Sequence, residues 1–145
     1  MQKRPRARKP RGTQTRAKAK AAGFRSGLEH KIADKLTKQG VDYEYETRRI
    51  PYLGKPHAYT PDFILPNGII VEAKGIFSSA DRSKHLLIKA QHPELDIRFV
   101  FGYANNKLTR KSKTTYWMWC DKNGFKWASE FIPKAWIDEE GTTDD

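Results

Sequence analysis

Three charged residues stand among apolar ones in the segment 59–75, which reads YTPDFILPNGIIVEAKG. Asp62, Glu72 and Lys74 belong to two short apolar runs that flank the turn-forming tripeptide at 66–68, a pattern typical of a β-hairpin. Two carboxylates brought together on such a hairpin repel each other, and burial among apolar side chains increases that cost. A hard divalent cation with oxygen ligands would compensate the two negative charges. The segment therefore indicates a site made of carboxylates, a cation and a lysine.

The register of this hairpin decides whether the three charges meet. A three-residue loop with Gly68 in the left-handed conformation places Asp62 opposite Glu72 and turns Lys74 to the same side of the sheet. A two-residue loop would put the two carboxylates on opposite faces. We expect the three-residue loop, and the interpretation of the site depends on it.

Each of these charges also has an ordinary structural explanation. Asp62 could cap a turn after Pro61, while Glu72 and Lys74 could form a surface ion pair on an edge strand. The complete pattern, Pro-Asp, nine residues and then Glu-x-Lys, is more specific than its parts. It resembles the signature of the PD-(D/E)XK nucleases, which implies that Asp and Glu hold Mg²⁺ and that Lys orients or activates the attacking water. We therefore favour the catalytic interpretation, since perturbed charges that converge on one face are typical of active sites.

The charge of the 145-residue chain is unevenly distributed. Of a net charge of +11, residues 1–20 contribute nine Lys or Arg and no acid, so the rest carries only +2. Such a basic surface indicates a polyanionic partner, most often nucleic acid, although the same stretch could simply be a solvated arm. The candidate DNA contacts in this arm are Arg4, Arg6, Arg8, Lys9, Arg11, Arg16, Lys18 and Lys20.

The length suits one folded domain, which we place at 23–145 after a basic arm at 1–22. The arm has no periodic apolar face, which predicts disorder in isolation and argues against a membrane-surface role. The chain has no apolar run that could span a bilayer and no leader-like segment. A single cysteine, Cys120, excludes an internal disulfide framework and fits a reducing cytoplasm. We expect Cys120 to be a buried, inert side chain.

Residues 24–40 predict the first helix, with Ser26 as N-cap and Gly40 at its end. Glu29 follows Ser26 by three residues, so a capping box explains it without any other role. From the residues alone we favour the cap for Glu29.

Further segments of the chain alternate between predicted strands and predicted helices. Residues 41–50 alternate like a half-buried strand, and Ser78 or Ser79 can cap a helix that runs to Gln91. Residues 96–101 form a short apolar strand, and a helix at 115–122 precedes a polar, acidic tail without recognisable signals. The aromatic residues of this last part could stack on bases, but we expect most of them to pack in the core.

Two basic segments follow the hairpin and are candidate phosphate contacts. One is the exposed side of the helix after 78, where a solvated charged face is an equally good interpretation. The other is the polar loop at 105–114. The candidates are Arg82, Lys84 and His85 on the helix and Lys107, Arg110 and Lys111 in the loop.

With these residues in view, the chain resembles the phage endonuclease I family, the Holliday-junction resolvases of the T-odd bacteriophages. The matching stretches are GFRSGLE at 23–29, the hairpin at 59–75, DRSKHLLIKAQHPELDIRFVF at 81–101 and IPKAWI at 132–137. The resemblance implies a restriction-endonuclease-like core, in which a mixed central sheet is flanked by helices. It also implies an intertwined homodimer that cuts four-way and other branched DNA in the host bacterial cytoplasm.

The resemblance assigns catalytic roles to Glu29, Asp62, Glu72 and Lys74. It makes Glu29 a metal ligand as well as a helix residue, and implies that Glu29 of one subunit completes the site of the other. We expect two Mg²⁺ ions per site, replaceable by Mn²⁺, held by the three carboxylates and the Ala73 backbone carbonyl, and no small-molecule cofactor. Sequence-specific cleavage of the restriction type, DNA binding without catalysis and RNA cleavage stay open as alternatives.

Overall fold

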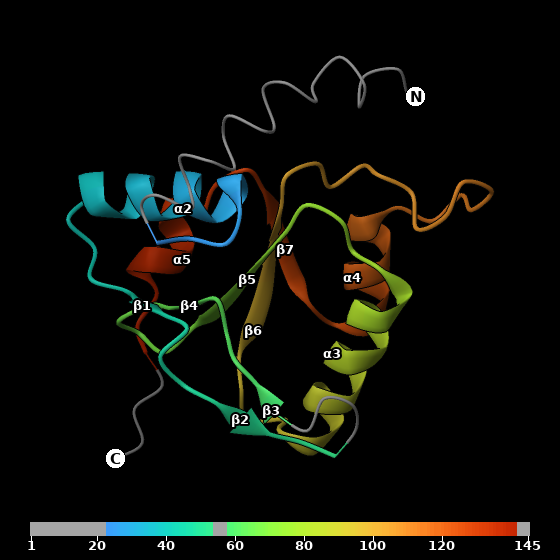
Figure 1. Cartoon of the computed structure of the whole chain (residues 1–145), viewed down its shortest axis with the longest axis horizontal. Helices are drawn as coiled ribbons and strands as arrows, with labels where there is room; N and C mark the ends of the chain where they lie inside the picture. The colour runs from blue at the N-terminus through green and yellow to red at the C-terminus, as the bar shows by residue number, and fades with distance from the viewer. Residues whose placement is uncertain (1–22, 54–57, 142–145) are drawn as a thin grey trace.

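The computed structural model describes residues 23–53 and 58–141, which form a mixed sheet with helices on both faces (Figure 1). The five strands lie in the order β1-β4-β5-β6-β7, antiparallel from β1 to β5 and parallel from β5 to β7. The pair β2 and β3 forms a separate antiparallel ribbon. The strands are β1 (Glu44–Tyr45), β2 (Ile50–Pro51), β3 (Ala58–Tyr59), β4 (Phe63–Ile64), β5 (Ile70–Lys74), β6 (Ile97–Phe101) and β7 (Lys126–Ser129).

In the part of the chain that the structure describes, four helices cover this sheet in two pairs. Figure 1 shows α2 (Gly27–Lys38) and α5 (Lys134–Asp138) on one side, with α3 (Ser79–Gln91) and α4 (Tyr116–Asn123) on the other. None of the helices in the described ranges has the length and apolar character needed to cross a bilayer. The predicted mixed sheet flanked by helices is confirmed, while the restriction-endonuclease-like core and the intertwined homodimer stay predictions.

Two apolar cores lie on the two faces of the sheet because strand side chains alternate in direction. On β6, Phe99 belongs to the core under α3 and α4, whereas Val100 belongs to the core under α2 and α5. Most of the aromatic residues near the C-terminus pack as expected, with Trp119 and Trp136 buried. Cys120 is fully buried, which raises the pKa of its thiol to about 12.

The hairpin that carries the charged residues has the expected three-residue loop. Phe63 pairs with Val71, and Gly68 has a φ of 91°, in the left-handed region that favours glycine. The same register places Asp62 opposite Glu72. The two-residue alternative is thereby excluded.

The predicted strand at 41–50 is wrong beyond Tyr45. Glu46 has a φ of 52°, which interrupts the extended backbone, and its N–H donates to the Asp62 carbonyl at 3.1 Å. The chain then turns, so that Ile50 pairs with Tyr59 in the separate ribbon. The alternation of side chains was correct for β1 only, because the left-handed residue shifts the pairing with the opposite segment by one residue between Tyr45–Phe63 and Ile50–Tyr59.

The predicted helix starts are confirmed by their capping bonds. The hydroxyls of Ser26, Ser78 and Thr115 accept the backbone N–H three residues ahead at the starts of α2, α3 and α4. These bonds satisfy amides that have no partner within the helix.

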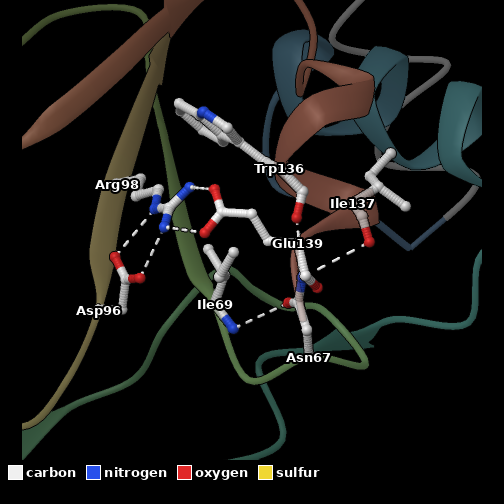
Figure 2. Close-up of polar contacts among 7 residues, drawn as sticks. All are labelled: Asn67, Ile69, Asp96, Arg98, Trp136, Ile137 and Glu139. Atoms are coloured by element: carbon white, nitrogen blue, oxygen red, sulfur yellow. Dashed lines mark hydrogen bonds and ion pairs between the residues drawn. The ribbon is translucent and has the colours of Figure 1, made fainter. Parts of the chain in front are cut away.

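A buried arginine joins the C-terminal segment to the sheet (Figure 2). Arg98 has a relative exposure of 2% and forms two hydrogen bonds with each of two carboxylates. Those to Asp96 are 2.9 and 2.7 Å long, and those to Glu139 are 2.7 and 3.0 Å. Its guanidinium also lies 5.2 Å from the centre of the Trp136 ring. The acidic tail, in which the sequence showed no signal, therefore has a structural role.

The turn of the hairpin at 59–75 holds the same C-terminal segment. The Asn67 side chain donates to the carbonyls of Trp136 at 2.8 Å and Glu139 at 3.0 Å, as Figure 2 shows. Two independent contacts thus fix the segment after α5 against the hairpin.

We expect the two acids around Arg98 to matter more for stability than the arginine itself. The double variant Asp96→Asn with Glu139→Gln leaves a buried cation without a counter-charge, which is strongly destabilising. Arg98→Met leaves only two acids whose side chains are 51% and 41% exposed and keeps the apolar stem. Thermal unfolding should therefore show the double variant melting roughly 5 °C or more below Arg98→Met. The reverse order would contradict the buried pairing.

Candidate active site

Asp62 and Glu72 hold each other in place across the hairpin. The Glu72 Oε2 accepts hydrogen bonds from the Tyr59 hydroxyl at 2.7 Å and from the Asp62 backbone N–H at 3.0 Å. The Asp62 Oδ2 accepts the Ala73 N–H at 2.9 Å. Both carboxylates are buried. The expected encounter of the two acids on one face of the hairpin is confirmed.

Glu29 reaches this pair from the first turn of α2. Its N–H donates to the Ser26 hydroxyl at 3.0 Å, so half of the predicted capping box is present. Its carboxylate Oε1 instead accepts the Arg25 N–H and the Tyr45 hydroxyl, both at 2.9 Å. The second bond of the predicted capping box, from the Ser26 N–H to the Glu29 carboxylate, is therefore wrong. The Glu29 carboxylate is instead directed to Asp62.

A further acid, Glu46, joins the site and was missed in the sequence. Carboxylate oxygens of Glu29, Glu46 and Asp62 lie within 4.8 Å of one another. Arg25 contacts Glu46 with a separation of 3.1 Å between Nη1 and Oε2. The alternation of residues 41–50 had suggested that Glu46 is a strand side chain without a special role. The left-handed backbone at Glu46 carries it to Asp62, and no sequence signal for that conformation exists at a glutamate.

The protonation of the two hairpin acids reflects their surroundings. Burial, then the charges of Glu72 and Glu29, raise the pKa of Asp62 to about 9. Burial also raises the pKa of Glu72, although Lys74 counteracts this. Ionising both acids is thus costly unless a cation is present. A set of converging carboxylate oxygens suits Mg²⁺ or a similar hard cation, so the residues fit the expected metal.

Lys74 lies two residues beyond Glu72 on β5, on the α3 side of the sheet. Its Nζ is 3.3 Å from the Asp81 Oδ1 on α3, and both side chains are mostly buried. Lys84 places its Nζ 5.7 Å from the centre of the Tyr59 ring. Two cations thus flank the buried carboxylates from the side of α3.

The candidate DNA contacts fall into three groups in the structure. The arm residues lie outside the described ranges. In the loop between β6 and α4, Lys107, Arg110 and Lys111 are exposed, as expected for phosphate contacts. On α3, Arg82 and Lys84 are half-buried, and the Arg82 Nη1 donates to the Phe77 carbonyl at 2.7 Å.

The expectation that His85 is exposed is wrong. Its relative exposure is 0%, which removes it as a DNA contact. The helix turns Asp81, His85 and Ile88 to the sheet, at the spacing of one helix face, whereas Leu86 and Leu87 are 40% and 41% exposed. Because Leu86, Leu87 and Ile88 are all apolar, the sequence pattern did not show which face of α3 is buried.

Comparison with known proteins identifies the family of this chain. The model of the family described as phage endonuclease I matches residues 11–143. The chain is 52% identical over 122 residues to Endonuclease I of Escherichia phage T7, a match that covers 83% of this chain and 82% of the relative. It is also 52% identical over 118 residues to Endodeoxyribonuclease 1 of Enterobacteria phage T3, covering 80% of this chain and 78% of the relative. The chain therefore belongs to the phage endonuclease I family.

Proposed function

We propose that this chain, an endonuclease by its family, resolves four-way and other branched DNA by metal-dependent hydrolysis of phosphodiester bonds. One observation carries the proposal: a carboxylate oxygen of Asp62 lies within 4.8 Å of one from Glu29, and the Asp62 N–H donates to Glu72 on β5, the strand that also carries Lys74. This combination of acids and a lysine has the PD-(D/E)XK pattern. The printed names of both relatives describe nucleases.

The buried acids would hold two Mg²⁺ ions, for which Mn²⁺ could substitute. Asp62 would be shared between them, with Glu72 and the Ala73 carbonyl holding one ion and Glu29 the other. Bound cations of this kind lower the pKa of a water molecule and stabilise charge on the attacking and leaving oxygens. The hydrogen bonds from Tyr59 and the Asp62 amide orient Glu72 for this role before any ligand binds.

Lys74 would orient the attacking water and offset negative charge on the phosphate. Its contact with Asp81 holds the ammonium group on the face of β5 that also carries Glu72. A positioned group of this kind contributes about 10²- to 10⁴-fold to a rate.

Recognition of a branched substrate would depend on shape and phosphate geometry rather than on base edges. The contacts would come from the arm and from Lys107, Arg110 and Lys111, which are exposed and basic. Lys84, whose charge acts on Glu72, would contact the phosphate being cut, together with Arg82 on the same helix. The place of action would be the cytoplasm of the host bacterium.

A homodimer would relate two active sites by the two-fold axis of a junction and allow paired cuts. Glu29 lies beside Asp62 of the same chain here. Exchange of the segment with α2 between two subunits would preserve the same contacts while dividing them between chains. We therefore keep the intertwined dimer as part of the proposal.

The proposal is tested by cleavage of a labelled four-way junction beside a linear duplex of the same sequence, in Mg²⁺. We expect paired cuts in the junction only, and a loss of about 100-fold or more for Lys74→Ala. Lys38→Ala removes an exposed lysine on α2 and should cut like the wild type. Binding without cleavage would leave a DNA-binding protein, and cutting of the linear duplex at one sequence would favour a restriction-type enzyme.

A further inference from the structure

The imidazole of His85 is a fully buried polar group that lies beside Glu72. Its side chain is completely inaccessible, and within the described ranges neither ring nitrogen has a hydrogen-bond partner. A buried polar group without a partner is costly. A packing role alone would be better filled by an apolar side chain, so this cost calls for a functional explanation.

The imidazole faces β5, the strand that carries Glu72. Its Nε2 lies 3.8 Å from the Glu72 Oε1, slightly beyond the usual hydrogen-bond range of up to about 3.2 Å. The other carboxylate oxygen, Oε2, already accepts from the Tyr59 hydroxyl and the Asp62 amide. The imidazole thus faces the oxygen of Glu72 that these two bonds leave free.

Aromatic contacts fix the plane of the ring. His85 packs edge to face against Tyr59, with ring centres 5.2 Å apart, and against Phe99, at 4.9 Å. With a proton on Nε2, the ring can donate to Glu72.

The spacing of α3 matches that of β5. Glu72 and Lys74, two residues apart on one face of β5, are separated by roughly 7 Å along the strand. Asp81 and His85, four residues apart on α3, are separated by about 6 Å along the helix. His85 consequently meets Glu72 while Asp81 meets Lys74, which shows that one helix face contacts both groups.

We propose that His85 is a positioning residue for the metal ligand Glu72: its Nε2–H donates to the Glu72 Oε1 and holds the carboxylate in the orientation that binds the cation. The inference rests on the proposed function, because it assumes that Glu72 is a ligand. Outer partners of this kind typically change metal affinity by 10- to 100-fold.

The test is calorimetric titration of Mn²⁺ into the full-length protein without DNA, so that the readout is independent of cleavage. His85→Leu should weaken Mn²⁺ binding by about 10-fold or more. His85→Gln offers an amide N–H close to the position of Nε2 and should restore affinity to within about 3-fold of the wild type. Ile88→Ala, on the same helix face, lowers stability by packing alone and should leave the affinity unchanged.

Glu72→Gln separates the two hypotheses. If it weakens Mn²⁺ binding while His85→Leu binds like the wild type, the role of His85 is refuted and the metal site stands. If Glu72→Gln binds Mn²⁺ as the wild type does, the proposed metal site fails, and the inference about His85 fails with it. If His85→Leu and His85→Gln weaken Mn²⁺ binding equally, and in proportion to their loss of thermal stability, His85 is only a packing residue.

Nuclear magnetic resonance of the imidazole gives a second readout that does not depend on the metal. Long-range proton–nitrogen correlations distinguish the two neutral tautomers, which coordinates alone do not. We expect the proton on Nε2, facing Glu72. A proton on Nδ1 would overturn the proposal, because Nε2 could then only accept.

Discussion

Glu72→Ala is expected to reduce cleavage of branched DNA by about 1000-fold or more while leaving junction binding within roughly threefold of the wild type. Glu72 is the buried acid whose two hydrogen bonds tie β5 to Tyr59 on β3 and to Asp62 just before β4, and its loss would remove a ligand of the proposed cation. DNA affinity, in contrast, would come from exposed basic residues away from it. Single-turnover cleavage rates and a binding titration without divalent cations measure the two effects separately.

A matched control for this variant is Glu94→Ala, which removes an exposed acid in the turn between α3 and β6. It should leave both cleavage and binding unchanged. Full activity of Glu72→Ala would remove Glu72 from the mechanism. A parallel loss of binding and cleavage would indicate that the hairpin is needed for the fold rather than for chemistry.

Asp62→Asn is expected to abolish cleavage and, at the same time, to stabilise the metal-free protein at neutral and alkaline pH. The folded protein holds Asp62 with a pKa raised to about 9, whereas an unfolded aspartate has a value near 3.9. A carboxyl whose pKa is raised on folding contributes most to the stability of the folded state at pH values below its unfolded pKa. That contribution is lost as the pH rises toward the folded value.

The stability of metal-free wild-type protein should therefore fall, relative to Asp62→Asn, between about pH 4 and pH 9. An amide cannot ionise, so the variant avoids both the burial of a charge and the repulsion from Glu72 and Glu29. At pH 8 we expect a gain on the order of 1–4 kcal/mol, equivalent to roughly 3–12 °C in the midpoint of unfolding. Thermal unfolding of both proteins in a chelator, across this pH range, measures the difference.

Added Mg²⁺ should reverse the order of stability. A ligand that binds only the folded state stabilises it by mass action, and the variant would lack the shared ligand. Asp42→Asn, at an exposed position, serves as the control and should follow the wild type at every pH. A variant that is less stable than wild type in the chelator would contradict the proposed repulsion among the buried acids.

The hairpin and the helix starts could be predicted because their signals are local. Gly68 is suited to the left-handed position of a three-residue loop, and that loop determines the register of every residue on both strands. Ser26 and Ser78 cap helices through bonds that reach only three residues along the chain. In each case the determining interaction lies within a few residues of sequence, where spacing is sufficient evidence.

The role of Glu29 was ambiguous for the same reason. The serine three residues before it gives a complete local explanation, and only the resemblance to phage endonuclease I suggested more. The structure directs its carboxylate from α2 to Tyr45 on β1 and to Asp62. Local spacing could not predict this arrangement.

The sequence by itself determined the mixed α/β pattern, the hairpin register and the encounter of Asp62 with Glu72. The tertiary structure alone decided that Glu46 joins the carboxylates, that His85 is buried beside Glu72, and that Arg98 binds Glu139 from the C-terminal segment. These contacts join residues far apart in sequence through the orientation of whole elements. A helix presents several faces of similar polarity, and the face that meets the sheet follows from the packing of the two cores.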